Sequence, residues 1–141
     1  MSSTLQKLLK VREQDKRKAT QLLARAQDRH AAHEAQIEET RAQLDAARRR
    51  SGQEGDPTLL SHYHSYQLRM EMERRHQERA LQQSAAEVEA ARDGLRHRVQ
   101  RAHVIASLLE RRAEEARLEE KRAETSVYDE LAVQGWWRES A

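Results

Sequence analysis

The sequence predicts an all-α fold: a two-helix antiparallel coiled-coil hairpin with a longer, overhanging C-terminal helix. The chain has four glycines and one proline, and two of the glycines and the proline fall within residues 51–57. Glycine and proline are the strongest local helix breakers, so a single turn separates two long helices. Charged residues make up 35% of the chain, aromatic residues make up 4%, and phenylalanine is absent. This leaves too little apolar mass for a globular core but enough for a narrow seam between two helices.

The chain is expected to form a single hairpin domain over residues 1–141. Its first helix covers about residues 4–50, its turn residues 51–57, its second helix about residues 58–134, and a short tail residues 135–141. Ser3 or Thr4 can cap the start of the first helix. The second helix is expected to begin with Asp56 as its cap and Pro57 as its first helical residue, a pair that is typical of helix starts.

In the first helix, apolar and small residues recur in steps of three and four. One extra step of four, from Ala26 to His30, predicts a local stutter in the coil. The predicted seam residues are Leu5, Leu8, Ala19, Leu22, Ala26, His30, His33, Ile37, Thr40, Leu44 and Ala47. Arg12 and Asp15 interrupt this seam near its start.

The second helix carries a continuous seven-residue repeat from Leu60. Its middle is apolar and its flanks are polar, which predicts a weak seam. One row of the repeat holds Leu60, Gln67, Arg74, Leu81, Val88, Leu95, Ala102, Leu109, Ala116 and Ala123. The other row holds Tyr63, Met70, Gln77, Ser84, Ala91, Arg98, Ile105, Arg112, Glu119 and Ser126.

The helix lengths predict an unpaired end. Antiparallel pairing about the turn would place Leu5 opposite about His103, and the last ~30 residues of the second helix would extend beyond the first. Such an overhang is either frayed or held by a partner. Residues 1–50 carry 12 basic and 7 acidic side chains, net +5, and residues 113–141 carry 4 and 8, net −4. This asymmetry favours the antiparallel orientation, although screened surface pairs contribute little stability.

Several functional classes are not expected. The sequence shows no apolar run long enough to span a membrane, no signal peptide and no cysteine, which fits a cytoplasmic protein without membrane insertion. No glycine-rich phosphate loop or convergent carboxylate pair is apparent, so neither enzymatic catalysis nor a cofactor is expected. His30 and His33 share a helix face, but no further ligands complete a metal site. The basic clusters at residues 16–18 and 48–50 are interpreted as solvated helix faces rather than a nucleic-acid site.

All five aromatic residues lie in two places, near the turn and at the C-terminus. Exposed tyrosine and tryptophan are enriched in contact hot spots, so both places are candidate binding surfaces. Tyr63 is equally well explained as a seam residue, whereas Tyr66 lies one position off the seam. Trp136 and Trp137 are either a tail contact or part of a disordered tail.

Two stretches resemble a known family. The opening Leu8-Leu9-Lys10-Val11-Arg12-Glu13, followed by Ala19, Leu22, Ala26 and Gln27, resembles the start of the flagellar export protein FliJ family. The stretch at residues 119–124, with Tyr128-Asp129-Glu130-Leu131-Ala132, is similar to the C-terminal part of that family and of the injectisome stalk proteins. The opening motif favours the flagellar system, and the choice between flagellum and injectisome is left open.

The resemblance implies a cytoplasmic stalk of a type III protein export apparatus, peripherally associated with the membrane. Its expected partners are the hexameric export ATPase, which it would stimulate, the export-gate membrane protein, and export chaperones. By position, ring contacts are expected at Leu5, Leu8, Val11, Arg12, Arg122, Tyr128 and Leu131. Gate or other partner contacts are expected at Tyr63, Tyr66 and Met70, with a further tail contact at Trp136 and Trp137.

Two alternatives are left open. The first is a generic structural coiled coil, such as an antiparallel homodimer, without an ATPase partner. The isolated chain is expected to be an elongated monomer, which would favour the stalk, whereas an obligate dimer would favour this scaffold. The second is nucleic-acid binding through the basic first helix, which would show as salt-sensitive retention on DNA.

Overall fold

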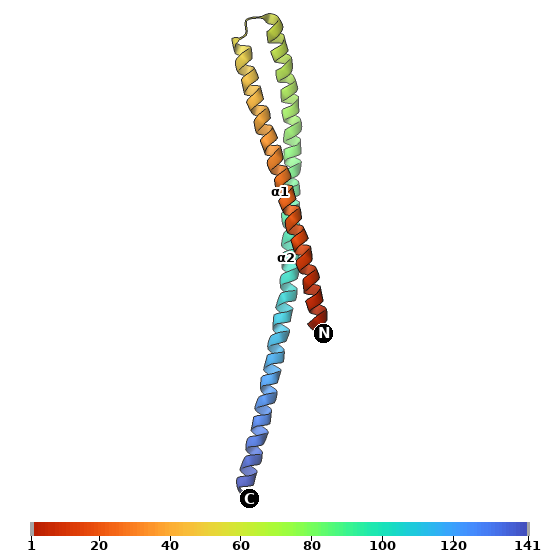
Figure 1. The fold of residues 1–141 in the computed structure, drawn as a ribbon, viewed down its shortest axis with the longest axis vertical. Coiled ribbons are helices and arrows are strands. Elements are labelled where there is room, and N and C mark those ends of the chain that lie inside the picture. The colour runs from red at the N-terminus through yellow and green to blue at the C-terminus, as the bar shows by residue number, and fades with distance from the viewer. Residues whose placement is uncertain (1, 141) are drawn as a thin grey trace. The chain divides into compact units, whose positions relative to one another are not determined.

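Two long helices account for nearly the whole chain. The computed structural model describes residues 2–140, and among these only residues 54–56 lie outside a helix. Helix α1 runs over Ser2–Gln53 and helix α2 over Pro57–Ser140 (Figure 1). The all-α fold, with two helices of which the second is longer, is therefore confirmed.

The loop between the helices is shorter than the turn predicted at residues 51–57. Helix α1 continues through Ser51, whose hydroxyl donates to the carbonyl of Arg48 at 3.0 Å. The carboxylate of Asp56 accepts a hydrogen bond from the N–H of Thr58 at 3.0 Å. Asp56 is thus the cap of α2 and Pro57 is its first residue, as predicted.

Both outer helix ends extend further than expected. Helix α1 already includes Ser3 and Thr4, which therefore lie inside the helix and do not cap it. Helix α2 continues past residue 134 through Gly135, Trp136 and Trp137 to Ser140. A single glycine costs a helix only about 1 kcal/mol and no proline follows, so nothing in the sequence ends α2 at residue 134. The expected tail is helical to Ser140, and residue 141 lies outside the described residues.

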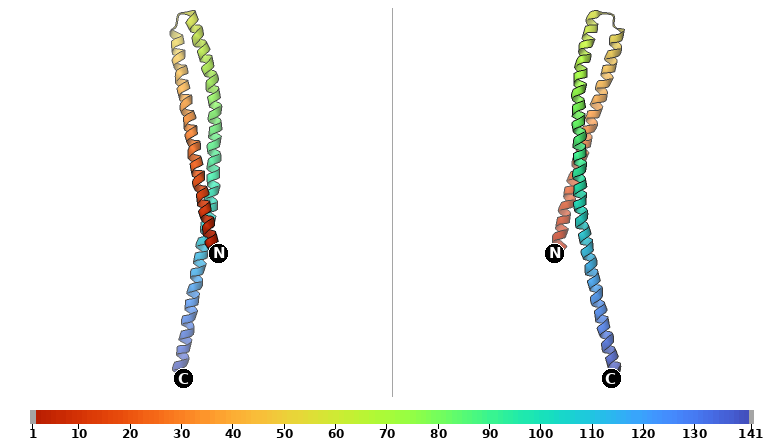
Figure 2. Two further views of the ribbon diagram at one scale, coloured as in Figure 1. Left: turned by 45° about the vertical axis from the view of Figure 1, so that its right-hand side comes forward. Right: turned by 180° about the vertical axis from the view of Figure 1, so that it is seen from behind.

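The chain divides into two compact units. The turn unit comprises residues 16–98, and the terminal unit comprises residues 1–15 and 99–141. In the turn unit, α1 and α2 run side by side in opposite directions from the loop (Figures 1 and 2). Direct bonds link them: His30 Nδ1 lies 2.8 Å from Ser84 Oγ, and the Gln67 amide donates to the Ala47 carbonyl at 3.4 Å.

The seam of the turn unit is a strict seven-residue repeat on α1. The prediction placed Leu22 in this seam, but Leu22 is 55% exposed and its neighbour Leu23 is partly covered. With Leu23 in the seam, the step from Ala26 to His30 belongs to a regular alternation of fours and threes. The predicted stutter is therefore absent. Burial is greatest at Ala19, Ala26, Ile37, Thr40, Leu44 and Ala47 on α1 and at Ser84 and Val88 on α2.

The terminal unit has a short covered stretch. Ala102 and Ile105 on α2 are buried, as the predicted repeat requires. Coverage of α2 continues to Leu109, whereas His103, the expected partner of Leu5, is exposed. Every residue of the stretch 110–134 is exposed. The uncovered end of α2 thus begins later than expected.

On α1 of the terminal unit, Leu8 was the predicted seam residue. It is 37% exposed, while Leu5 and Leu9 are partly covered. Leu9 therefore replaces Leu8 in the repeat that also contains Leu23. Arg12, which was predicted to interrupt the seam, is partly covered too and therefore lies in the seam.

Charged residues stabilise the seam near the loop. The guanidinium of Arg74, in a predicted seam row, donates to Glu71 at 3.0 Å and to Glu78 at 2.6 Å. Arg48 on α1 donates to Glu71 at 2.8 Å and so links the two helices. The hydrogen bond from Arg74 lowers the pKa of Glu71 below its ordinary value of 4.5, and the charges of Arg74, Arg48 and Arg75 lower it further. Desolvation raises this pKa but does not outweigh them.

The adjacent leucines of α1 provide a direct test of the seam. We expect Leu23→Ala to lower the free energy of unfolding by about 1–3 kcal/mol, because it removes a partly covered side chain from the repeat. The matched change Leu22→Ala should alter it by less than about 0.5 kcal/mol, because Leu22 faces water. Urea unfolding followed by circular dichroism measures both. An equal loss in the two variants would contradict this seam.

The Glu71 pair predicts a pH dependence. Because the pKa of Glu71 is lower in the folded chain, its stabilising effect is present above about pH 4.5, the ordinary value for glutamate, and disappears as the pH falls through the folded value. We therefore expect Glu71→Gln to lower the thermal midpoint at pH 7, with the difference from the unmodified chain shrinking toward pH 3.

Glu39→Gln, which removes the same charge from an exposed position of α1, is the matched control. It should leave the thermal midpoint nearly unchanged at pH 7. A Glu71→Gln variant as stable as this control at pH 7 would show that the Arg48–Glu71–Arg74 cluster does not stabilise the fold.

Candidate partner-binding surfaces

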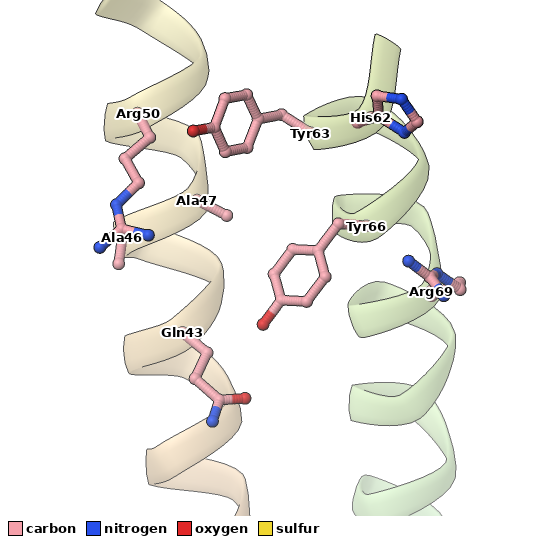
Figure 3. Close-up of a pocket in the computed structure, with 8 residues that line it drawn as sticks. All are labelled: Gln43, Ala46, Ala47, Arg50, His62, Tyr63, Tyr66 and Arg69. Carbon is pink, nitrogen blue, oxygen red and sulfur yellow. The ribbon is translucent and has the colours of Figure 1, made fainter. Parts of the chain in front are cut away.

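A groove lies between α1 and α2 beside the loop, within the turn unit. It encloses about 540 Å³ and is shown in Figure 3. Four lining residues come from each helix: Gln43, Ala46, Ala47 and Arg50 from α1, and His62, Tyr63, Tyr66 and Arg69 from α2. We call it the turn-end groove.

The groove exists because bulky residues of α2 face small residues of α1. The rings of Tyr63 and Tyr66 point toward α1, where Ala46 and Ala47 leave the space between the helices unfilled (Figure 3). Both tyrosines are partly covered. The amide of Gln67, which follows Tyr66 in the sequence, also donates to Ser51 Oγ at 3.0 Å and so links the two helices here.

The groove has a positive rim. Arg50, His62 and Arg69 are exposed, and none of the eight lining residues is acidic. Within residues 2–140, neither Arg50 nor Arg69 makes an ion pair with an acidic side chain. The groove therefore offers aromatic surface together with uncompensated positive charge.

Of the predicted gate contacts, Tyr63 and Tyr66 line this groove. Met70 is partly covered in the seam row and is not among the lining residues. The α1 side of the groove was missed from the sequence. This side could have been found from the antiparallel pairing about the loop, because that pairing brings residues 43–50 opposite the tyrosines.

The second surface is the exposed end of α2 in the terminal unit, residues 110–140, which we call the C-terminal arm. Tyr128 is 70% exposed and Leu131 is 58% exposed. Trp136 and Trp137 are 61% and 66% exposed and contact each other edge to face, with ring centroids 5.4 Å apart. The large exposed apolar side chains of the arm are Leu118, Val127, Tyr128, Leu131, Val133, Trp136 and Trp137.

The start of α1 contributes fewer exposed groups. Val11 is 49% exposed and lies one turn from Leu8, so the two share a face. Leu5 is partly covered. The guanidinium of Arg12 lies 3.8 Å from Asp15, and its covered Nε makes no hydrogen bond within residues 2–140.

The predicted ring contacts do not form one cluster. The covered part of α2 ends at Leu109, and Arg122 and Tyr128, both exposed, lie about 20 Å and about 30 Å further along the helix. Leu8 and Val11 are therefore separate from Arg122, Tyr128 and Leu131.

The position of His30 is explained by packing. His30 lies in the seam, with Nε2 3.0 Å from the Glu34 carboxylate and Nδ1 next to Ser84. Among residues 2–140, no group of three or more His, Asp or Glu side chains is arranged to hold a metal ion. In the same part of the chain, neither helix has a stretch apolar enough to cross a membrane.

Comparison with known proteins identifies the family of the chain. No curated protein and no solved structure is significantly similar to the chain. The family model described as flagellar FliJ protein matches residues 1–141, which is the entire sequence. The chain therefore belongs to the flagellar FliJ protein family.

Proposed function

We propose that this chain is the central stalk of the flagellar export ATPase, with its C-terminal arm bound in the centre of the hexameric ring. Family membership gives the chain a role in flagellar protein export. The exposed C-terminal arm is the observation that carries the finer proposal. It is a single helix, and among the described residues its large apolar side chains are exposed.

A lone helix suits the opening of a ring. Its diameter with side chains is about 10–12 Å, the least that a folded segment can have. Helices without a packed face are marginal in water, so a partner that covers the arm would also stabilise it. Binding and ordering of the arm are thus coupled in this proposal.

The arm presents its apolar groups close together. Val127, Tyr128 and Leu131 lie within one turn of α2 and share a side of the helix. Asp129 and Glu130 flank them, so the ring surface that accepts this patch would combine an apolar pocket with positive charge. Leu8 and Val11 would form a separate contact, nearer the covered part of the terminal unit.

The turn-end groove would contact the export gate. Its tyrosines supply aromatic surface, and Arg50 and Arg69 would select an acidic or polar partner. Export chaperones are further candidates for this end. In this proposal the chain stays in the cytoplasm and associates with the membrane through the gate.

The ATPase assay tests the ring-binding proposal. We expect the full chain to stimulate hydrolysis by the flagellar export ATPase of its own cell, and removal of residues 113–141 to abolish the stimulation. The double variant Tyr128→Ala, Leu131→Ala should raise the half-maximal concentration about tenfold or more, because exposed aromatic anchors dominate contact energies.

Glu115→Ala, on the same exposed arm but outside the apolar patch, is the matched control and should stimulate normally. Circular dichroism confirms that each variant keeps its helix content. If the truncated chain is folded and still stimulates ATP hydrolysis as the full chain does, the stalk proposal is refuted.

A further inference from the structure

Two surfaces of this chain are complementary to each other. The turn-end groove holds two tyrosines and a positive rim formed by Arg50 and Arg69. The last turns of α2 carry the exposed pair Trp136 and Trp137. The lining of the groove lacks acidic residues, and the end of α2 is rich in them.

We propose that the C-terminal arm of one copy binds in the turn-end groove of a second copy of this chain. Residues 124–141 hold four acidic side chains, Glu124, Asp129, Glu130 and Glu139, against the single basic side chain of Arg138. Within residues 2–140, none of these four acids is held by an ion pair to a basic side chain. Carboxylates of the arm would therefore meet unpaired guanidinium groups at the groove.

The aromatic groups are complementary as well. Tryptophan is a frequent contact anchor, and each ring pair buries a large apolar area. Edge-to-face and stacked contacts between the tryptophans of the arm and Tyr63 or Tyr66 would remove both from water. Guanidinium groups stack favourably on indole rings, so Arg50 and Arg69 would add cation–π contacts to the tryptophans of the arm.

The occupant must come from another molecule. Helix α2 is unbroken from Pro57 to Ser140, and it carries both the tyrosines and the tryptophans. Tyr66 and Trp136 are separated by 70 residues of this one helix, so we assign the groove to the arm of a second copy. A two-fold pair, in which each arm occupies the other groove, leaves neither surface free.

The inference does not depend on the proposed function. Self-association is measured without any ATPase, and ATPase stimulation is measured at concentrations where the chain is a monomer. Where both proposals hold, the ATPase ring and the second copy compete for the same arm.

Intrinsic fluorescence tests this contact directly, because both tryptophans of the chain lie in the arm. We expect the emission maximum to shift to shorter wavelength as the concentration of the full chain rises. Sedimentation should show the mass changing from one copy to two over the same range. Arg50→Glu with Arg69→Glu should weaken the association about tenfold or more, since it reverses the charge of the rim.

The double variant Glu130→Arg, Glu139→Arg reverses the charge of the arm and should weaken association similarly, whereas mixing it with the reversed-rim variant should restore association. Arg79→Glu is the matched control, because Arg79 is exposed on α2 and does not line the groove. It should associate like the unmodified chain.

Three results would overturn the proposal. The first is a chain that remains a monomer at all concentrations, with no fluorescence shift. The second is an association that survives Trp136→Ala with Trp137→Ala, which would place the contact elsewhere. The third is an association equally weakened by Arg79→Glu, which would show a general charge effect rather than occupation of the groove.

Discussion

The seam between α1 and α2 in the turn unit is the contact on which the rest of the structure depends. It is narrow and mostly small or polar: Ala19, Ala26, Thr40 and Ala47 are buried, and Ile37, 2% exposed, is its largest fully buried side chain. Small residues allow two helices to approach closely but supply little apolar area. Direct polar bonds, such as His30 to Ser84 and Arg48 to Glu71, therefore help to fix the pairing of the two helices.

The same seam explains why the two candidate surfaces lie where they do. At the loop, tyrosines of α2 face alanines of α1, and the mismatch in size leaves the turn-end groove. Beyond Leu109, α2 loses coverage, and its apolar side chains are left in contact with water. One surface results from poor filling between paired helices, and the other from the exposure of α2 beyond Leu109.

Much of this fold could be predicted from the sequence, because breakers and repeats are local features. The repeat from Leu60 holds through Leu109 on α2 except at Arg98, which is exposed, and Asp56 with Pro57 marks the observed start of that helix. The seam of α1 was displaced by one residue at Leu8 and at Leu22. Each precedes a second leucine, and a local pattern cannot tell which of two adjacent apolar residues faces the partner. Only the regular repeat that continues through Ile37 shows that Leu9 and Leu23 are the leucines that face the partner helix.

The candidate sites were less predictable, because they depend on pairing across the loop. The sequence indicated Tyr63 and Tyr66, but the opposite wall of the groove follows only once the pairing of α1 with α2 is known. The ring contacts predicted by position are separated along α2, since coverage ends before Arg122. Isolated glycine did not interrupt the helix at Gly135, so both tryptophans are helical.

Hydrogen exchange shows whether the end of α2 stays uncovered until a partner binds it. In dilute protein alone, amides of residues 110–140 should exchange rapidly, while those around Ile37 should be protected. Addition of the hexameric export ATPase should protect residues 110–140 and leave the protection around Ile37 unchanged. Rapid exchange of residues 110–140 in a saturated mixture with the ATPase would contradict the account.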